Sequence, residues 1–527
     1  MTDALLAPIW RTEPKKWSYA TASHLLNRAG FGGSAAEVRQ LVDLGPEKAV
    51  AYLVRYQQLP DTFKEITFGE FTGPLFAGRD EMRQMRPGQM SDNMRELKAR
   101  GELLKQMNQD QRQAMLSIRL AAQRGKLEEM KLWWLDRMVR TRRPLEEKMT
   151  LFWHGLFVSS SVTVRNSYAL YQQNKLFRKF AVGNYKALTL EVSKDPAMLE
   201  YLNNNQNKKG KPNENYAREL MELFTMGIGN YTENDIKESA RAFTGWTFAG
   251  DRFVFNRGEH DEGQKTFLGR TGNWDGGDII DIIFDQQATP RYIARRLLKF
   301  FALDGASGAE APESMVNALA RVVVANRYEM APVLETLFAS TWFYSKDVMR
   351  TQIKSPVQLV VGSLRALGVN ITDPRAVDNA LKMMGQELYG APTVKGWDGG
   401  RAWVNTSTLF ARYNLPAYLG TGRLPSTSKK PGDGEMRGQF NDLATGWQPQ
   451  LDLAEARAST TDGVVDHYLR VLIGNNVDPR KRDELIEFLN ATGDASSHHL
   501  DPTSAEVENR IRSLVHLIMA MAEYQIC

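Results

Sequence analysis

The stretch that decides the fold reads NENYARELMELFTMG over residues 213–227. Its apolar residues recur every three or four positions, which is the spacing of an amphipathic helix. Asn213 is suited to cap the start of such a helix with its side-chain oxygen. Gly227 and Gly229 are typical of a helix end. We therefore predict one helix running from Asn213 to Met226.

Similar spacing along most of the chain predicts a mainly α fold with many helices. A second helix is expected directly after the first, at 233–244, and Pro144 suits the first turn of another. Further predicted helical segments are 16–58 with breaks at 30–33 and 45–46, 103–139, 275–285, 289–303, 312–325, 330–340, 354–367, 374–387 and three more in the last hundred residues.

Two short segments, 253–255 and 266–268, are rich in β-forming residues. Gly258 and Gly263 lie between them, so the pattern predicts one small β-hairpin within residues 252–269.

The chain shows no internal repeat of fixed period, and we expect residues 18–527 to form a single large unit. Residues 1–17 would be an N-terminal extension. Two segments rich in glycine, proline and polar residues interrupt the helical pattern. We predict an irregular insertion at 59–100 and a surface loop at 421–450.

The composition limits the classes of function. The 527 residues are 42% hydrophobic, with a formal net charge of +5, which is mild for this size and gives no pull towards nucleic acid. The one cysteine, Cys527, excludes a disulfide framework within the chain and a multi-thiolate zinc site. A metal would need His, Asp, Glu or Asn ligands. The sequence contains no P-loop, G-x-S-x-G, H-E-x-x-H or dinucleotide-binding motif.

The N-terminal residues 1–17 lack the basic region and long apolar core of a secretory signal. No apolar stretch of the sequence is long enough to span a bilayer. We therefore expect a cytoplasmic protein, with export to the periplasm alongside a partner chain as the alternative.

Polar residues of the 213–226 helix form one stripe, because Asn215, Arg218, Glu219 and Glu222 share a face at helical spacing. Two carboxylates at i and i+3 can hold a cation or act as an acid and a base, and an adjacent arginine keeps them ionised. The alternative is a solvent-facing stripe with an Arg218–Glu222 ion pair.

The 233–244 helix carries a similar stripe that ends at Arg241, next to the sequence Thr244-Gly245-Trp246. The two stripes could face each other as an ion-pair network around a site, or serve as structure only. His260 and Asp261 follow in a glycine-flanked loop, with Lys265 four residues on. They suit a metal-ligand pair or an oriented base, and the alternative is a turn with a satisfied imidazole.

Two further stretches suggest binding residues. His154 lies in the aromatic segment 152–157, where it is either at the edge of a site or a hydrogen-bonded core residue. Residues 396–407 read GWDGGRAWVNTS. Glycines allow the backbone to approach a ligand closely. Trp397 and Trp403 offer flat faces for a sugar or another ring. The alternative is a tight connector fixed by two buried tryptophans.

These stretches together resemble a known bacterial family of unknown function, domain of unknown function 1800, from about residue 18 to the C-terminus. The most specific match is NYARELMELFTMG at 215–227, and the order of the others also matches. Family members often have a second histidine where this chain has Leu156. The other matching pieces are HLLNRAGFG at 24–32, FWH at 152–154, TGW at 244–246, HD at 260–261 and GWDGG at 396–400 with Trp403 and 405–412.

The resemblance implies little chemistry, but such proteins are commonly encoded beside a sulfatase- or alkaline-phosphatase-like protein. That implies a partner of this kind and an anionic or carbohydrate-type substrate.

Our leading hypothesis from the sequence is a hydrolase-like enzyme with a carboxylate/His site that could hold a divalent metal ion. The rival hypothesis is a non-catalytic binding or assembly protein, in which these polar groups are paired off and inaccessible. In the enzyme, the catalytic residues would be Glu219, Glu222, His260 and Asp261, the metal ligands Glu219, Glu222, His260 and His154, and the substrate-binding residues Asn215, Arg218, Arg241, Lys265, Trp397, Arg401 and Trp403.

Overall fold

The structure is a computed structural model. It describes residues 5–69, 72, 108–306, 308–369, 374–421, 460–474, 477–490 and 505–527. Most of the predicted insertion at 59–100 and all of the predicted loop at 421–450 except Thr421 lie outside these residues.

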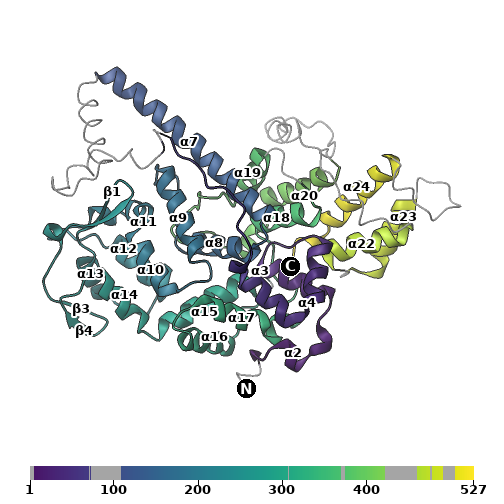
Figure 1. The fold of residues 1–527 in the computed structure, drawn as a ribbon, viewed down its shortest axis with the longest axis horizontal. Coiled ribbons are helices and arrows are strands. Elements are labelled where there is room, and N and C mark those ends of the chain that lie inside the picture. Colours follow the sequence, from purple (N-terminus) through teal and green to yellow (C-terminus); the bar gives the residue numbers. More distant parts are fainter. Residues whose placement is uncertain are drawn as a thin grey trace.

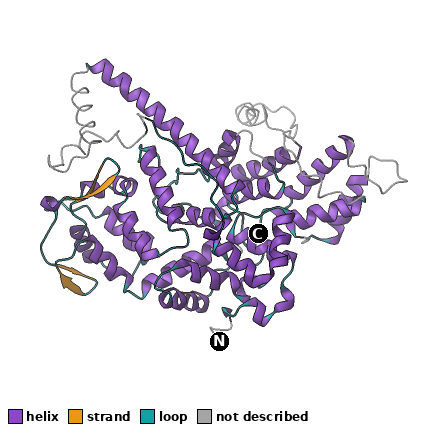
Figure 2. Ribbon diagram, in the orientation of Figure 1, coloured by secondary structure: helices purple, strands orange, loops and turns teal. Residues whose placement is uncertain are grey.

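The described chain is mainly α-helical, as predicted, and Figures 1 and 2 show helices throughout, with strands confined to one end. The helices are α2 (Ile9–Thr12), α3 (Tyr19–Ala29), α4 (Ala35–Val54), α7 (Gln109–Arg140), α8 (Pro144–Leu156), α9 (Ser167–Lys179), α10 (Tyr185–Lys194), α11 (Pro196–Tyr201), α12 (Asn215–Glu219), α13 (Glu233–Ala242), α14 (Gly276–Phe284), α15 (Ala288–Phe301), α16 (Glu313–Ala325), α17 (Met330–Ala339), α18 (Pro356–Ala366), α19 (Pro374–Met383), α20 (Thr406–Thr421), α22 (Thr461–Ile473), α23 (Pro479–Asn490) and α24 (Ala505–Ala520).

The strands form two hairpins in place of the one predicted. Strand β1 (Trp246–Ala249) pairs antiparallel with β2 (Arg252–Phe255), and β3 (Lys265–Phe267) pairs with β4 (Arg270–Gly272). The two β-prone segments are therefore both strands, but each pairs with a near neighbour across a short turn. Such local pairing closes a shorter loop than the predicted pairing would, and so costs less chain entropy.

Helix α12 also differs from its prediction, because the helix continues as a π-helix over Leu220–Thr225. A π-helix shifts the backbone hydrogen bonds and leaves carbonyl groups in need of other partners. Tyr185 donates its hydroxyl to the carbonyl of Phe224, and Tyr292 donates to the carbonyl of Leu223. These bonds tie the family motif to α10 and α15.

Helix α8 lies at the centre of the fold, in contact with α3, α4, α7 and α9 (Figure 1). Every residue of α8 except Gly155 is buried, as expected for a helix enclosed on all sides. Two hydrophobic clusters meet along it, since Leu151 belongs to one and Phe152 to the other. The buried polar groups of this helix therefore face protein and not bulk water.

One such group, Glu147, is fully buried and completely paired. Its carboxylate accepts hydrogen bonds from Arg137 at 2.9 Å, from Arg178 at 2.8 Å and from the indole of Trp134 at 2.8 Å. Burial alone would raise the pKa of Glu147, but Arg178 and Arg137 together lower it. Glu147 thus joins α7, α8 and α9.

No helix among the described residues is long and apolar enough to cross a lipid bilayer.

Candidate functional site

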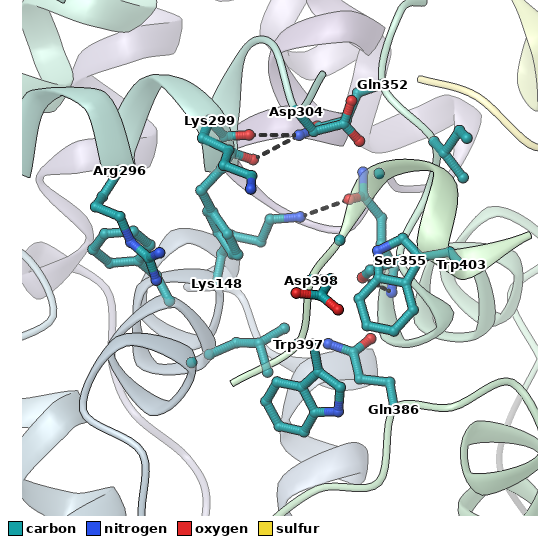
Figure 3. A pocket seen from close by; sticks show the side chains of 18 residues that line it. Lys148, Arg296, Lys299, Asp304, Gln352, Ser355, Gln386, Trp397, Asp398 and Trp403 are labelled. Carbon is teal, nitrogen blue, oxygen red and sulfur yellow. Dashed lines mark hydrogen bonds between the residues drawn. The ribbon is translucent and has the colours of Figure 1, made fainter. Parts of the chain in front are cut away.

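A cavity of about 130 Å³ lies beside α8, where the two hydrophobic clusters meet. We call it the Lys148 pocket. Its walls come from α8, from the end of α15, from the segment that leads into α18 and from the glycine-rich loop at 396–403. The side chains that line it are Lys148, Leu151, Phe152, Arg296, Lys299, Phe300, Asp304, Gln352, Ile353, Ser355, Gln358, Gln386, Trp397, Asp398 and Trp403, together with Gly155, Gly399 and Gly400 (Figure 3).

Lys148 is the most unusual group in this wall. Its side chain is buried, and its ammonium donates a hydrogen bond of 3.0 Å to the side-chain oxygen of Gln358. The ammonium also lies over the rings of Phe31 at 5.0 Å and Phe300 at 5.4 Å. No Asp or Glu of the described chain forms an ion pair with it. Lys148 therefore lacks the partner that a buried charge normally has.

The environment of Lys148 disfavours its charged form. Burial lowers the pKa of the Lys148 ammonium to about 7, and the nearby Arg28 guanidinium acts in the same direction, while negative charge at Cys527 opposes both. Near neutral pH, a large share of the molecules thus carries a neutral amine at this position. The neutral amine has a free electron pair and can act as a nucleophile, whereas the charged ammonium can bind an anion.

The acceptor of Lys148 is itself fixed by other bonds. Gln358 donates through its side-chain nitrogen to the backbone oxygen of Asn27 at 2.9 Å and to the sulfur of Cys527 at 3.1 Å. Its oxygen is therefore left to face Lys148.

Gln352 closes the neighbouring wall. Its side-chain nitrogen donates to the carbonyl oxygens of Lys299 and Phe300 at the end of α15 (Figure 3), while its oxygen accepts from Arg28. Arg28 is buried and also donates to backbone oxygens of Ala302 and Val348. This arginine of the HLLNRAGFG motif thus fixes the pocket walls.

Cations outnumber unpaired carboxylates around the cavity. Arg296 and Lys299 line the α15 side, and no described carboxylate forms an ion pair with either. Asp398 lies at the exposed mouth and pairs with Lys395 at 2.9 Å. Burial raises the pKa of Asp304, which favours its neutral form. The summed charge therefore favours an anion.

The glycine-rich loop brings aromatic faces to the cavity. Gly396 has a φ of +85°, and a Cβ there would lie 2.7 Å from the backbone oxygen of Gly155 on α8. The loop can approach α8 closely only because this position is glycine. Trp397 and Trp403, which the sequence suggested as cleft residues, both lie in the wall of the Lys148 pocket. The indole N–H of Trp397 is buried and has no acceptor among the described residues.

The residues predicted as a catalytic centre lie elsewhere, in separate clusters. In the first, the Arg218 network, Arg218 pairs with Glu233 at 2.9 Å and with Glu214 at 3.5 Å. Glu222 accepts a hydrogen bond of 2.9 Å from the hydroxyl of Tyr231. Burial raises the pKa of the half-buried Glu219, and the charge of Glu222 adds to the rise. The predicted Arg218–Glu222 pair is replaced by these contacts.

In the second cluster, the Arg241 network, Arg241 pairs with Glu238 at 2.9 Å and with Asp261 at 2.8 Å. The Arg241 guanidinium lowers the pKa of Asp261 to about 2, so this carboxylate stays ionised. The ring of His260 is buried, with Nδ1 2.9 Å from the backbone oxygen of Thr244. The Thr244-Gly245-Trp246 motif and the His260-Asp261 motif are therefore in contact in the Arg241 network.

The other predicted site residues bond mainly to backbone. Lys265 donates to the backbone oxygens of Asp261 and of Gly263, the latter at 3.0 Å, and Asn215 donates to that of Leu202 at 3.2 Å. Arg401 donates to the backbone oxygen of Ala306 at 2.7 Å.

His154 is a buried, neutral hydrogen-bond acceptor beside the pocket. Its Nε2 accepts a hydrogen bond of 3.2 Å from the backbone N–H of Tyr389, and its ring lies 5.8 Å from that of Trp397. Burial lowers the pKa of His154 to about 4. Across the described chain, no three His, Cys, Asp or Glu side chains gather as a metal site would require. The predicted ligands Glu219, Glu222, His260 and His154 thus do not form one group.

Lys148, Arg296 and Lys299 were not predicted from the sequence as site residues. A signal for Lys148 was present, because it is the one lysine of the segment LEEKMTLFWHGL at 145–156, which is mostly apolar after its first turn. A cation within an apolar helix must be paired, neutral or functional. Arg296 and Lys299 carry no such signal, since their place beside α8 depends on the tertiary fold.

The fold and the pocket define a mainly helical protein with a cation-lined cavity at its centre. The chain belongs to the family described as protein of unknown function (DUF1800), which matches residues 24–526 and thus nearly the whole chain. No curated protein and no solved structure matches it.

Proposed function

We propose that this protein binds a small anionic molecule in the Lys148 pocket. The observation that carries the proposal is the buried Lys148 ammonium, which has one hydrogen-bond acceptor and no carboxylate partner among the described residues. A buried charge without a partner is costly, and an anion beside it would offset that cost. Arg296 and Lys299 add positive charge on the same side of the cavity.

The size and the walls of the pocket restrict the ligand further. A cavity of roughly 150 Å³ lined by apolar side chains is known to admit benzene. At about 130 Å³, the Lys148 pocket would take a ligand, or one end of a ligand, of single-ring size. Phe300 and Trp397 offer aromatic faces to such a ring. An aromatic acid or an acidic sugar meets these requirements.

The test compares ligands of the same shape and different charge. We expect benzoate and glucuronate to bind in titration calorimetry at pH 7, and benzamide and glucose to bind at least about tenfold more weakly, a difference of about 1.4 kcal/mol. Lys148→Met should remove binding of the acids, whereas Lys186→Met should not, because Lys186 pairs with Asp281 on the surface. Equal affinity for acids and neutral analogues would overturn the proposal.

The hydrolase-like activity suggested by the sequence is a narrower proposal, in which an anionic or carbohydrate-type substrate is cleaved by the carboxylate/His residues. The pKa of Glu219 is raised by burial and by the charge of Glu222, which is the direction that a general acid needs. Nitrophenyl phosphates, sulfates and glycosides would report turnover. Hydrolysis by the wild type that Glu219→Gln abolishes would support the activity, and absence of turnover on all three would reject it.

A second candidate function is assembly with a sulfatase- or alkaline-phosphatase-like partner. The Arg241 network favours it, because Arg241, Asp261 and His260 are all engaged in contacts within the chain, as a structural role requires. Co-expression of the tagged chain with such a protein encoded beside it tests this function. A stable complex on size-exclusion chromatography would support it, and separate elution of the two proteins would exclude it.

A further inference from the structure

The described residues include four buried lysines, and their partners differ. Lys131 pairs with Glu387 and lies 3.8 Å from Asp378, so its charge is compensated. Lys265 donates to backbone oxygens. Lys354 lies 3.8 Å from the centre of the Tyr524 ring.

Lys148 is the one of the four that combines a single hydrogen-bond acceptor with a place in the wall of the 130 Å³ cavity. An ammonium has three hydrogens to donate, and the described residues provide Lys148 with one oxygen. Loss of one proton leaves an amine that keeps its bond to Gln358 and directs an electron pair elsewhere. The Lys148 side chain is buried and its nitrogen lies beside the rings of Phe31 and Phe300, an apolar setting that favours the neutral amine.

We propose that Lys148 is a nucleophile that forms an imine with a small 2-oxo carboxylic acid bound in the Lys148 pocket. This inference rests on the proposed function, because the acid group must first be held by the cations of the pocket. In the reaction, the nitrogen of the neutral amine attacks the keto carbon and the C=O bond becomes a C–OH bond. Loss of that oxygen as water, with the two hydrogens that leave the nitrogen, gives the C=N bond.

The walls of the cavity suit each part of such a substrate. The carboxylate would be held by Arg296 or Lys299 on the α15 side. Asp304 lines the same cavity, and burial raises the pKa of its carboxyl, which is the direction that proton donation to the departing hydroxyl needs. The volume of about 130 Å³ favours a short 2-oxo acid over a long one.

The experiment uses the full chain, pyruvate and sodium cyanoborohydride, which reduces an imine to a stable secondary amine. Peptide mapping by mass spectrometry then locates the adduct. At pH 7 we expect Lys148 to carry one adduct, and its labelling to exceed that of the partly exposed Lys186 by at least about tenfold, since each unit of pKa changes the neutral fraction of an amine tenfold. Lys131, buried and paired, is an internal control that should stay unlabelled.

A pH profile separates a nucleophile from a structural lysine. Labelling of Lys148 should rise from pH 5 to pH 8 and then level off, because burial lowers the pKa of Lys148 to about 7. The charge of Arg28 favours the neutral amine and the charge at Cys527 opposes it. The other charged side chains in the wall of the same pocket are Arg296, Lys299, Asp304 and Asp398. Labelling of all lysines in proportion to their exposure would overturn the inference.

Calorimetry with the unreactive analogue benzoate distinguishes failure of this inference from failure of the proposed function. Lys148→Arg lacks the primary amine, so it should form no adduct at this position. If wild-type protein binds benzoate and pyruvate leaves Lys148 unlabelled, the imine is excluded and the anion pocket stands. If benzoate also fails to bind, both proposals fall.

Discussion

The ammonium of Lys148 on α8 donates one hydrogen bond of 3.0 Å to the side-chain oxygen of Gln358 on α18, across 210 residues of sequence. This bond joins the helix at the centre of the fold to the segment that closes the pocket. It is also the only hydrogen bond that the described residues give this buried ammonium, so the stability of the protein should depend on whether Lys148 is charged.

The first prediction concerns the stability of the protein between pH 7 and pH 10. The pKa of Lys148 is about 7 in the folded chain and near 10.4 in the unfolded chain, so over this range the unfolded chain binds more protons and stability rises with pH. Relative to Lys148→Met, the free energy of unfolding of the wild type should gain about 1 kcal/mol per pH unit. Urea denaturation of both proteins at three pH values measures this gain in the free energy of unfolding. Burial also lowers the pKa of Lys354, so the difference between the two proteins is the informative quantity.

The second prediction concerns the buried Glu147. Glu147→Gln should destabilise the fold by roughly 3 kcal/mol, because it leaves Arg137 and Arg178 without their shared negative partner. The folded-state pKa of Glu147 is lowered, so its stabilisation is present at neutral pH and is lost as the pH falls through that value. Thermal unfolding at pH 7 compares the stability of the Glu147→Gln variant with that of the wild type. Unfolding temperatures that match within error would show that these contacts add no stability.

The third prediction compares two glycines of the pocket loop. Gly396→Ala should weaken benzoate binding and destabilise the fold by about 2 kcal/mol, because its Cβ would meet the backbone oxygen of Gly155 at 2.7 Å. Gly399→Ala is the matched control, since Gly399 also has a positive φ but nothing within 4 Å of the added Cβ. It should cost about 1 kcal/mol from backbone strain alone. Calorimetry and urea denaturation of both variants are required, and equal effects would contradict this account of the loop.

The fourth prediction separates the Arg241 network from the pocket. Arg241→Gln should reduce stability by about 1 kcal/mol, because its pairs with Asp261 and Glu238 are partly exposed and screened by solvent. Benzoate binding should be unchanged in this variant. A clear loss of binding with the fold intact would place the network in the binding machinery and require a different site.

Much of the helical fold follows from local sequence. The predicted helices at 312–325 and 330–340 differ by no more than one residue at either end from α16 and α17, because their apolar periodicity and their ends are local properties. The π-helix at Leu220–Thr225 could not be predicted in this way. It depends on the hydroxyl groups of Tyr185 and Tyr292, which reach its carbonyls from other helices.

The pocket was predicted only in part. Trp397 and Trp403 were predicted because they lie among glycines that allow close approach to a ligand. Lys148 lies in the same wall only through the packing of α8 against a loop more than 240 residues later. The carboxylate stripes were visible in the sequence, but periodicity alone cannot tell a catalytic carboxylate from one paired by a neighbouring helix. Glu238 and Asp261 prove to be paired, each with Arg241.

The ionisation of Lys148 itself is the most direct test of the central claim. NMR titration of protein with ¹³C-labelled lysine side chains follows each ammonium, and the Lys148→Arg variant assigns the signal. We expect one lysine signal, absent from the variant, to titrate near pH 7 and to shift to higher pH when benzoate is added, as an anion beside the ammonium requires. If the Lys148 signal titrates near pH 10.4, the buried amine is an ordinary ammonium and the account is contradicted.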